Sequence, residues 1–176
     1  MNLKVLPNSP DEKPWYADGL EFTCQTCGNC CTGGPGYVWM TPEEVAKLAI
    51  HLNLSVDETM EKHCRIIGKR VSLNEIRNAA GEYDCVFLVD KKIKGPDGVM
   101  QTKRVCGVYP VRPLQCRTWP FWDGNLKSEK AWDHAAERCH GMAVGGRKFT
   151  LEQIEQIRTA AEWPKRPPTS KEPKAK

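Results

Sequence analysis

Four cysteines fall within eight residues of this chain, and this run constrains the fold more than any other feature. Its pattern, C-x2-C-x2-C-C, consists of Cys24, Cys27, Cys30 and Cys31. Two residues between cysteines allow the backbone to turn so that both thiolates face one centre. Residues 33–36 then read Gly-Gly-Pro-Gly, which predicts a looped, ligand-bearing segment rather than a regular helix over residues 22–36.

The number of cysteines also limits the kind of protein that this can be. Nine of the 176 residues are cysteine, and those outside the run are single residues: Cys64, Cys85, Cys106, Cys116 and Cys139. An odd number of cysteines without an apolar export signal argues against a disulfide framework. No apolar stretch is long enough to cross a membrane. We therefore expect a cytoplasmic protein that binds metal ions and has no membrane partner.

Cys64 differs from the other cysteines because it shares a helical apolar stripe with Met60 and Ile67. This spacing predicts a core residue rather than a ligand. The remaining eight thiolates would suffice for two four-cysteine sites, or for one larger site with bridging sulfurs. A single C-x2-C-x2-C run completed by a remote cysteine favours a [4Fe–4S] cluster, and zinc stays open.

A second informative segment lies between Cys106 and Phe121 and contains three prolines, which stiffen a non-helical path. It also contains Arg112 and Arg117. A zinc ion or [4Fe–4S] cluster held by four thiolates carries a charge of about −2 and needs donors around it. We therefore expect these two arginines to support the bound cofactor without ligating it.

The combined motifs resemble the YkgJ-type cysteine-cluster family of zinc- or iron-chelating domains. The resemblance extends from Phe22 to Gly141 and includes FTCQTCGNCC from residue 22, CVFL from residue 85, C-x-V-Y-x-x-R-P-x-x-C-R-x-W-P from residue 106 and C-x-G from residue 139. It implies metal chelation by Cys24, Cys27, Cys30, Cys31, Cys85, Cys106, Cys116 and Cys139. Cys64 lies outside these motifs.

Capping patterns predict the helices. Thr-Pro-Glu-Glu at 41–44 and Ser-Val-Asp-Glu at 55–58 each begin a helix, the second with an apolar stripe that reaches Ile67. A third helix is expected from Thr150, with Pro164 as its stop. The first two would form a helical pair.

The strand signals are weaker. Residues 84–90 and 103–109 are rich in β-branched and aromatic side chains and flank a Gly-Pro-Asp-Gly turn at 95–98. They predict a short β-hairpin, whereas residues 110–142 are expected to be irregular. The predicted fold class is therefore a small, irregular α+β single domain stapled by metal.

We expect three parts along the chain. Residues 1–21 would form an N-terminal arm, residues 22–163 the metal-binding domain and residues 164–176 a disordered basic tail. The tail has five basic residues and one acid, so it accounts for the whole formal net charge of +4. A neutral body makes nucleic acid an unlikely partner.

No nucleotide-binding, hydrolase or metalloprotease motif occurs, so no catalytic residue is assigned. The predicted function is chelation of zinc or iron through eight thiolates. The alternative is an iron–sulfur redox protein, or an accessory subunit of an oxidoreductase or of a protein-modifying enzyme. Whether the chain is an enzyme, and which protein partner it has, stays open.

Overall fold

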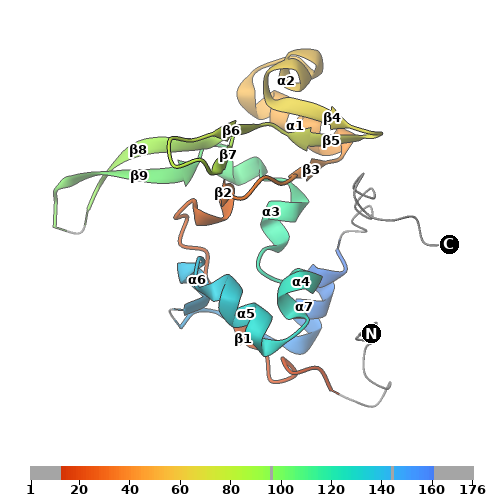
Figure 1. The fold of residues 1–176 in the computed structure, drawn as a ribbon, viewed down its shortest axis with the longest axis vertical. Helices are drawn as coiled ribbons and strands as arrows, with labels where there is room; N and C mark the ends of the chain where they lie inside the picture. The colour runs from red at the N-terminus through yellow and green to blue at the C-terminus, as the bar shows by residue number, and fades with distance from the viewer. Residues whose placement is uncertain (1–12, 96, 144, 161–176) are drawn as a thin grey trace.

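The chain forms both helices and strands in the computed structural model, which describes residues 13–95, 97–143 and 145–160 (Figure 1). This arrangement confirms the α+β class. The predicted tail, which includes Pro164, lies outside the described residues, and so do residues 1–12 of the expected arm. The limits of the three parts therefore stay a prediction.

The predicted helix starts are confirmed. In this part of the chain the α-helices are α1 (Pro42–Leu52), α2 (Val56–His63), α3 (Leu114–Thr118), α4 (Asp123–Leu126), α5 (Glu129–Ala136), α6 (His140–Ala143) and α7 (Leu151–Arg158). Two single-turn 3₁₀ helices are η1 (Asn29–Cys31) and η2 (Tyr109–Val111). The hydroxyls of Thr41, Ser55 and Thr150 each accept the backbone N–H three residues on, which closes the capping boxes of α1, α2 and α7.

The strands form four small antiparallel sheets. Their bounds are β1 (Leu20–Glu21), β2 (Thr32–Gly33), β3 (Trp39–Met40), β4 (Cys64–Ile67), β5 (Arg70–Leu73), β6 (Glu75–Arg77), β7 (Tyr83–Cys85), β8 (Leu88–Lys94), β9 (Met100–Cys106) and β10 (Lys148–Phe149). The strand orders are β1-β10, β2-β7-β6, β3-β5-β4 and β8-β9. Strands of two to seven residues agree with the expected irregularity.

The helical stripe predicted through Ile67 is wrong beyond His63. The chain leaves α2 there and enters β4, where Cys64 pairs with Leu73. Strand pairing is the physical reason: the backbone of residues 64–67 forms hydrogen bonds with β5, and the local sequence does not predict this pairing. Cys64 is nevertheless a core residue, only 8% exposed.

The predicted hairpin exists, but its two strands have other bounds than expected. Leu88 pairs with Cys106 and Lys94 with Met100. β8 therefore lies later in the chain than the predicted strand at 84–90, and β9 lies earlier than the predicted strand at 103–109. Residues 84–85 belong instead to β7. The expectation of an irregular segment at 110–142 is wrong, because α3 to α6 and η2 occupy much of it. These helices have only three to eight residues, too few for a periodic apolar pattern to be visible.

Two hydrophobic clusters divide the molecule. The first lies under α1 and the β3-β5-β4 sheet and contains Met40, Val45, Leu48, Cys64, Leu73, Phe87 and Val108. The second joins α4, α5 and α7 and contains Tyr16, Phe121, Leu126, Trp132 and Ile154. In Figure 1 the elements of the first cluster lie above those of the second, with α3 between them. Because both cores are small, a bound metal that connects the two halves would add to the stability of the fold.

The N-terminal residues pack onto the second cluster. Trp15 donates its indole N–H to the Leu126 carbonyl at 2.7 Å, and the Tyr16 hydroxyl bonds Glu155 at 2.7 Å. None of the described helices combines the length and the hydropathy that a membrane crossing needs.

Candidate metal centre

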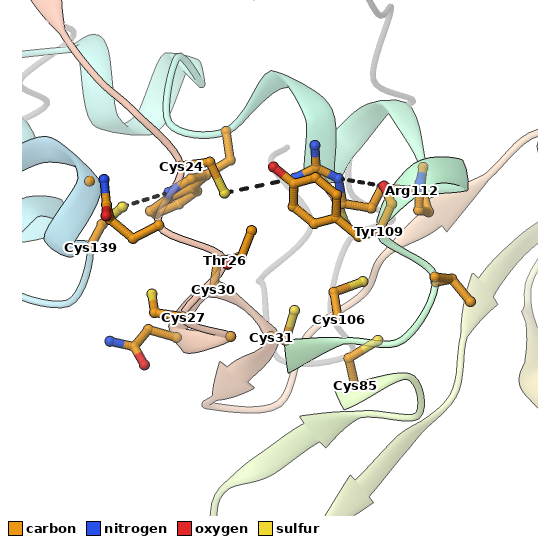
Figure 2. Close-up of a pocket in the computed structure, with 18 of the residues that line it drawn as sticks. Cys24, Thr26, Cys27, Cys30, Cys31, Cys85, Cys106, Tyr109, Arg112 and Cys139 are labelled. Atoms are coloured by element: carbon orange, nitrogen blue, oxygen red, sulfur yellow. Dashed lines mark hydrogen bonds between the residues drawn. The ribbon is translucent and has the colours of Figure 1, made fainter. Parts of the chain in front are cut away.

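A cavity of about 50 Å³ lies between the two hydrophobic clusters, and eight of the nine cysteines line it. They are Cys24, Cys27, Cys30, Cys31, Cys85, Cys106, Cys116 and Cys139. Figure 2 labels all of them except Cys116. Leu73 and Val108 of the first cluster also line the cavity, and Phe22 packs against the second. Cys64 does not reach the cavity wall. The structure thus brings together the eight predicted ligands and separates the ninth cysteine from them.

Five separate parts of the chain deliver these cysteines. Cys24 and Cys27 lie in the loop after β1, and Cys30 and Cys31 lie in η1. Of the others, Cys85 ends β7, Cys106 ends β9, Cys116 lies in the middle of α3 and Cys139 lies between α5 and α6. All nine cysteines are free thiols.

Two glycines allow the backbone segments to approach closely. Gly28 has a φ of +73°, and a Cβ there would lie 2.7 Å from the Leu88 side chain and 3.0 Å from the Arg104 carbonyl. A Cβ on Gly141 would collide with the carbonyl oxygen of Thr23, whose N–H donates to Gly141 at 3.0 Å. Glycine at these positions therefore lets the cysteine loop pack against the hairpin and lets Cys139 approach that loop.

A partly exposed polar contact joins three of the cysteine-bearing segments. The Asp84 carboxylate accepts the Thr32 hydroxyl at 2.5 Å and also pairs with the Arg104 guanidinium. The Thr32 hydrogen bond and Arg104 hold the pKa of Asp84 below its usual range. Thr32 follows Cys31, Asp84 precedes Cys85 and Arg104 lies two residues before Cys106, so the contact sets how β2, β7 and β9 meet at the cavity. Sequence reasoning missed it, because no local pattern connects Thr32 with Asp84.

The sulfurs interact with one another at one end of the cavity. The Cys31 thiol can donate its one proton to the sulfur of Cys106 or to that of Cys30. This donation lowers the pKa of Cys106 to about 6 and that of Cys30 to about 7, and it raises the pKa of Cys31. Two of these sulfurs therefore reach the thiolate form, which binds metal, near neutral pH.

Burial acts in the opposite direction on the thiols of Cys85, Cys116 and Cys139. It raises the pKa of Cys85 to about 11 and raises the pKa of Cys116 and Cys139 as well. The charges of Cys30 and Cys106 act on Cys85 and Cys116, whereas those of Cys27 and Cys30 act on Cys139. Cys30 therefore lies within electrostatic reach of both ends of the cavity.

Arg112 lines the cavity and contacts Cys24 (Figure 2). Its Nη1 lies 4.0 Å from the Cys24 sulfur, its Nε donates to the Tyr109 carbonyl at 3.0 Å, and its guanidinium stacks 3.5 Å from the centre of the Tyr109 ring. The Tyr109 hydroxyl also hydrogen-bonds Cys24, which raises the pKa of Tyr109. At the other side, the Trp119 indole N–H donates to the Cys139 sulfur at 3.3 Å. These donors match what thiolates around a cofactor require.

The structure does not bring Arg117 to the cavity. Its guanidinium lies 3.8 Å from the Glu44 carboxylate at the start of α1, and its side chain is half exposed. Arg112 and Arg117 both came from the same proline-rich segment, but α3 begins between them and turns Arg117 toward α1. Sequence spacing alone has no means to separate the two.

The donor set fits a thiophilic metal. Apart from the cysteines, Arg112 is the one charged side chain among the described residues that line the cavity. None of these lining residues is an Asp or Glu, so no carboxylate competes with the sulfurs. Within the same part of the chain, no three His, Cys, Asp or Glu side chains already surround one point as ligands of a single ion. Binding would require the cysteines to turn their sulfurs from one another toward the metal. Sites made of four cysteine thiolates typically bind zinc or an iron–sulfur cluster.

Comparison with known proteins agrees with this geometry. Over 155 residues the chain is 30% identical to an uncharacterized protein of Methanocaldococcus jannaschii, and the match covers 86% of this chain and 75% of that protein. No solved structure matches the present chain significantly. The model of the CxxCxxCC family, described as a "putative zinc- or iron-chelating domain", matches residues 23–140. All eight cysteines of the cavity lie within that match, and the chain therefore belongs to the CxxCxxCC family of zinc- or iron-chelating domains.

Proposed function

We propose that this protein chelates zinc or iron through the eight thiolates that line the cavity. One observation supports the proposal above all others: eight cysteines from five parts of the chain face one space, while Cys64 packs in a core. Thiols used only for packing have no reason to converge in this way. Bound metal would join the two hydrophobic halves, which are small on their own.

The neighbours of each sulfur support a division into two sets. Cys85 and Cys106 act on Cys31 and Cys116, and Cys106 acts on Cys85, so these four form one set. Cys30 acts on Cys31, Cys85 and Cys116 as well. The other set is formed by Cys24, Cys27, Cys30 and Cys139, in which a remote cysteine completes the C-x2-C-x2-C run. Adjacent Cys30 and Cys31 would then serve different centres, and Cys30, being near both sets, is the candidate for a shared sulfur.

Each four-thiolate centre would carry a charge of about −2 whether it holds Zn²⁺ or a [4Fe–4S]²⁺ cluster. Arg112 would offset part of this charge and Tyr109 would donate to Cys24. Apolar neighbours such as Leu73, Val108 and Trp119 would keep water from the sulfurs.

Metal analysis with an acid-labile sulfide assay on protein purified without oxygen tests the proposal. Zinc without sulfide indicates zinc thiolate centres, and iron with sulfide indicates iron–sulfur clusters. Cys116→Ser should lower the metal content, whereas Cys64→Ala, the matched control, should not. Parent protein without stoichiometric metal, or equal metal content in all three proteins, would refute chelation by these residues.

Double substitutions test the division into two sets. Cys85→Ser combined with Cys116→Ser should lose little more metal than either change alone, because both act on one centre. Cys116→Ser combined with Cys27→Ser should lose the sum of the two individual losses. Losses across the two sets that are no larger than either single loss would indicate a single polynuclear centre. Additive losses for Cys85→Ser and Cys116→Ser would contradict their assignment to one centre.

A second candidate is redox chemistry at an iron–sulfur centre, on its own or as an accessory to an oxidoreductase or protein-modifying enzyme. The observation that favours it is the hydrogen bonding of indole and guanidinium N–H groups to the sulfurs of Cys139 and Cys24. Such bonds, together with solvent exposure, tune the reduction potential of these clusters. Reversible bleaching of a visible absorption band by dithionite would support it. A colourless zinc protein would exclude it.

A further inference from the structure

The hairpin of β8 and β9 projects from the body of the protein as an arm (Figure 1). Within the described residues these two strands pair only with each other. A two-stranded ribbon of seven residues per strand is marginally stable by itself, and both of its edges are open. An arm of this length therefore calls for a role beyond its contribution to the fold.

The register shows which backbone groups of the arm are free. Gly95 N–H donates to Val99 and Gly107 N–H donates to Phe87, so the odd-numbered residues between them use their backbone groups inside the hairpin. Because the bonded pairs of an antiparallel ladder alternate, the even-numbered residues point their N–H and C=O groups outward. In the outer half of the arm these are Lys92 and Lys94 on β8 and Met100 and Thr102 on β9. No hydrogen bond between described residues uses them.

The arm also concentrates positive charge. Four lysines lie on it, Lys91, Lys92, Lys94 and Lys103, and none of them forms an ion pair with a described residue. Lys91 stands directly opposite Lys103, an arrangement that destabilises the hairpin itself. Lysines on an open edge discourage pairing with a second copy of the same strand. A strand with acidic side chains would instead relieve the repulsion.

Exposed apolar side chains accompany the lysines. Val89 is 44% exposed, Val99 58% and Met100 60%. A nucleic acid backbone would contact the lysines but gain nothing from these three residues. A peptide strand with alternating acidic and apolar side chains would contact both groups. The observations therefore favour a protein partner.

We propose that the β8–β9 arm is a docking element that binds an acidic, extended segment of a partner protein as a third strand. The outward N–H and C=O groups of Lys92 and Lys94 would pair with its backbone, and the lysine ammonium groups would pair with its carboxylates. The root of the arm lies at the cavity, where Cys85 and Cys106 precede and end the ribbon. Lys103 on β9 donates to the Gln25 carbonyl at 3.3 Å, which connects the arm to the loop that carries Cys24.

The test uses the full chain as purified, with its metal. The probes are an array of peptides of about nine residues, with Asp or Glu at alternate positions and Val, Ile, Thr or Phe between them. The strongest binder is labelled with fluorescein and titrated by anisotropy against the parent and against Lys92→Glu/Lys94→Glu. A matched variant, Lys127→Glu/Lys130→Glu, makes the same charge change at exposed positions away from the arm.

Lys92→Glu/Lys94→Glu should weaken binding about tenfold or more, with folding and metal content unchanged, while the matched variant binds like the parent. A peptide N-methylated on the amides that face the arm should also bind about tenfold or more weakly, because strand pairing needs those donors. Equal binding by the two double variants, or by the N-methylated peptide, would overturn the proposal. So would a DNA duplex of about 20 base pairs that binds more tightly than every peptide and depends on the same lysines.

Discussion

Removing the guanidinium of Arg112 should weaken the retention of metal, although Arg112 is not a ligand. Its Nη1 is 4.0 Å from the Cys24 sulfur, and its charge also acts on Cys30, Cys106 and Cys116. Arg112→Ala therefore removes a positive charge from a cavity whose bound centre would be negative. The same substitution at Arg117, whose partner is Glu44, removes a charge of the same kind from outside the cavity.

The geometry bounds the size of the effect. At an effective dielectric constant of about 20, two unit charges 4 Å apart interact by about 4 kcal/mol. Arg112 is partly exposed and its charge is partly screened, so a smaller loss is expected. Substitutions of groups that support metal ligands commonly cost about 10–100-fold in affinity, or about 1.4–2.7 kcal/mol.

Competition with a chromophoric chelator measures this directly on the parent, Arg112→Ala, Arg112→Lys and Arg117→Ala. Lysine should restore only part of the affinity, because it retains the charge but neither stacks as a planar group on Tyr109 nor donates through several N–H groups. Arg117→Ala should bind metal like the parent. Far-ultraviolet circular dichroism of each variant checks that the fold is kept.

Equal metal affinities of the parent, Arg112→Ala and Arg112→Lys would refute this reasoning. Arg112 would then be an ordinary surface residue held by Tyr109. An equal loss in Arg117→Ala would be just as damaging, since it would show that the distance to the cavity does not matter.

Three further predictions concern stability. Cys64→Ala should keep its full metal content and lose about 1–2 kcal/mol of unfolding free energy, because it removes a buried atom from the first core, whereas Cys116→Ala loses metal; equal metal loss would contradict this. Removal of metal by a chelator should broaden or abolish the calorimetric unfolding transition, and an unchanged sharp transition would count against coupling of binding and folding. Burial and the Glu155 hydrogen bond raise the pKa of Tyr16 to about 12, so between pH 10 and 12 the folded state keeps a proton that the unfolded chain releases. The unfolding free energy should therefore fall by up to about 2.7 kcal/mol over this range, and urea titrations of Tyr16→Phe should lack that part of the decrease.

Local signals in the sequence were enough to predict the elements whose ends are set within one turn. Thr41, Ser55 and Thr150 each begin a helix because hydroxyl and backbone groups three residues apart satisfy one another. The glycine-rich turn near residues 95–98 likewise predicted a hairpin. Such interactions are local, so they are visible before the chain is folded.

Elements that depend on distant partners were not predictable in this way. Cys64 enters β4 rather than extending α2, because β5 pairs with it. The short helices α3 to α6 are too brief to be stable alone and form where Phe121, Leu126 and Trp132 meet Ile154 in the second core. Their residues read as irregular because tertiary packing, not periodicity, stabilises them.

The candidate site divides along the same line. The composition and spacing of the cysteines by themselves were enough to predict zinc or iron binding, since thiolates at C-x2-C spacing are suited to these metals wherever they are placed. Only the tertiary structure decided that the eight sulfurs share one cavity between two cores, that Arg112 faces it and that Arg117 does not. Spacing determines what a residue can ligate, whereas α3 and the Thr32–Asp84 contact determine where it points, because orientation is set by groups far apart in the chain.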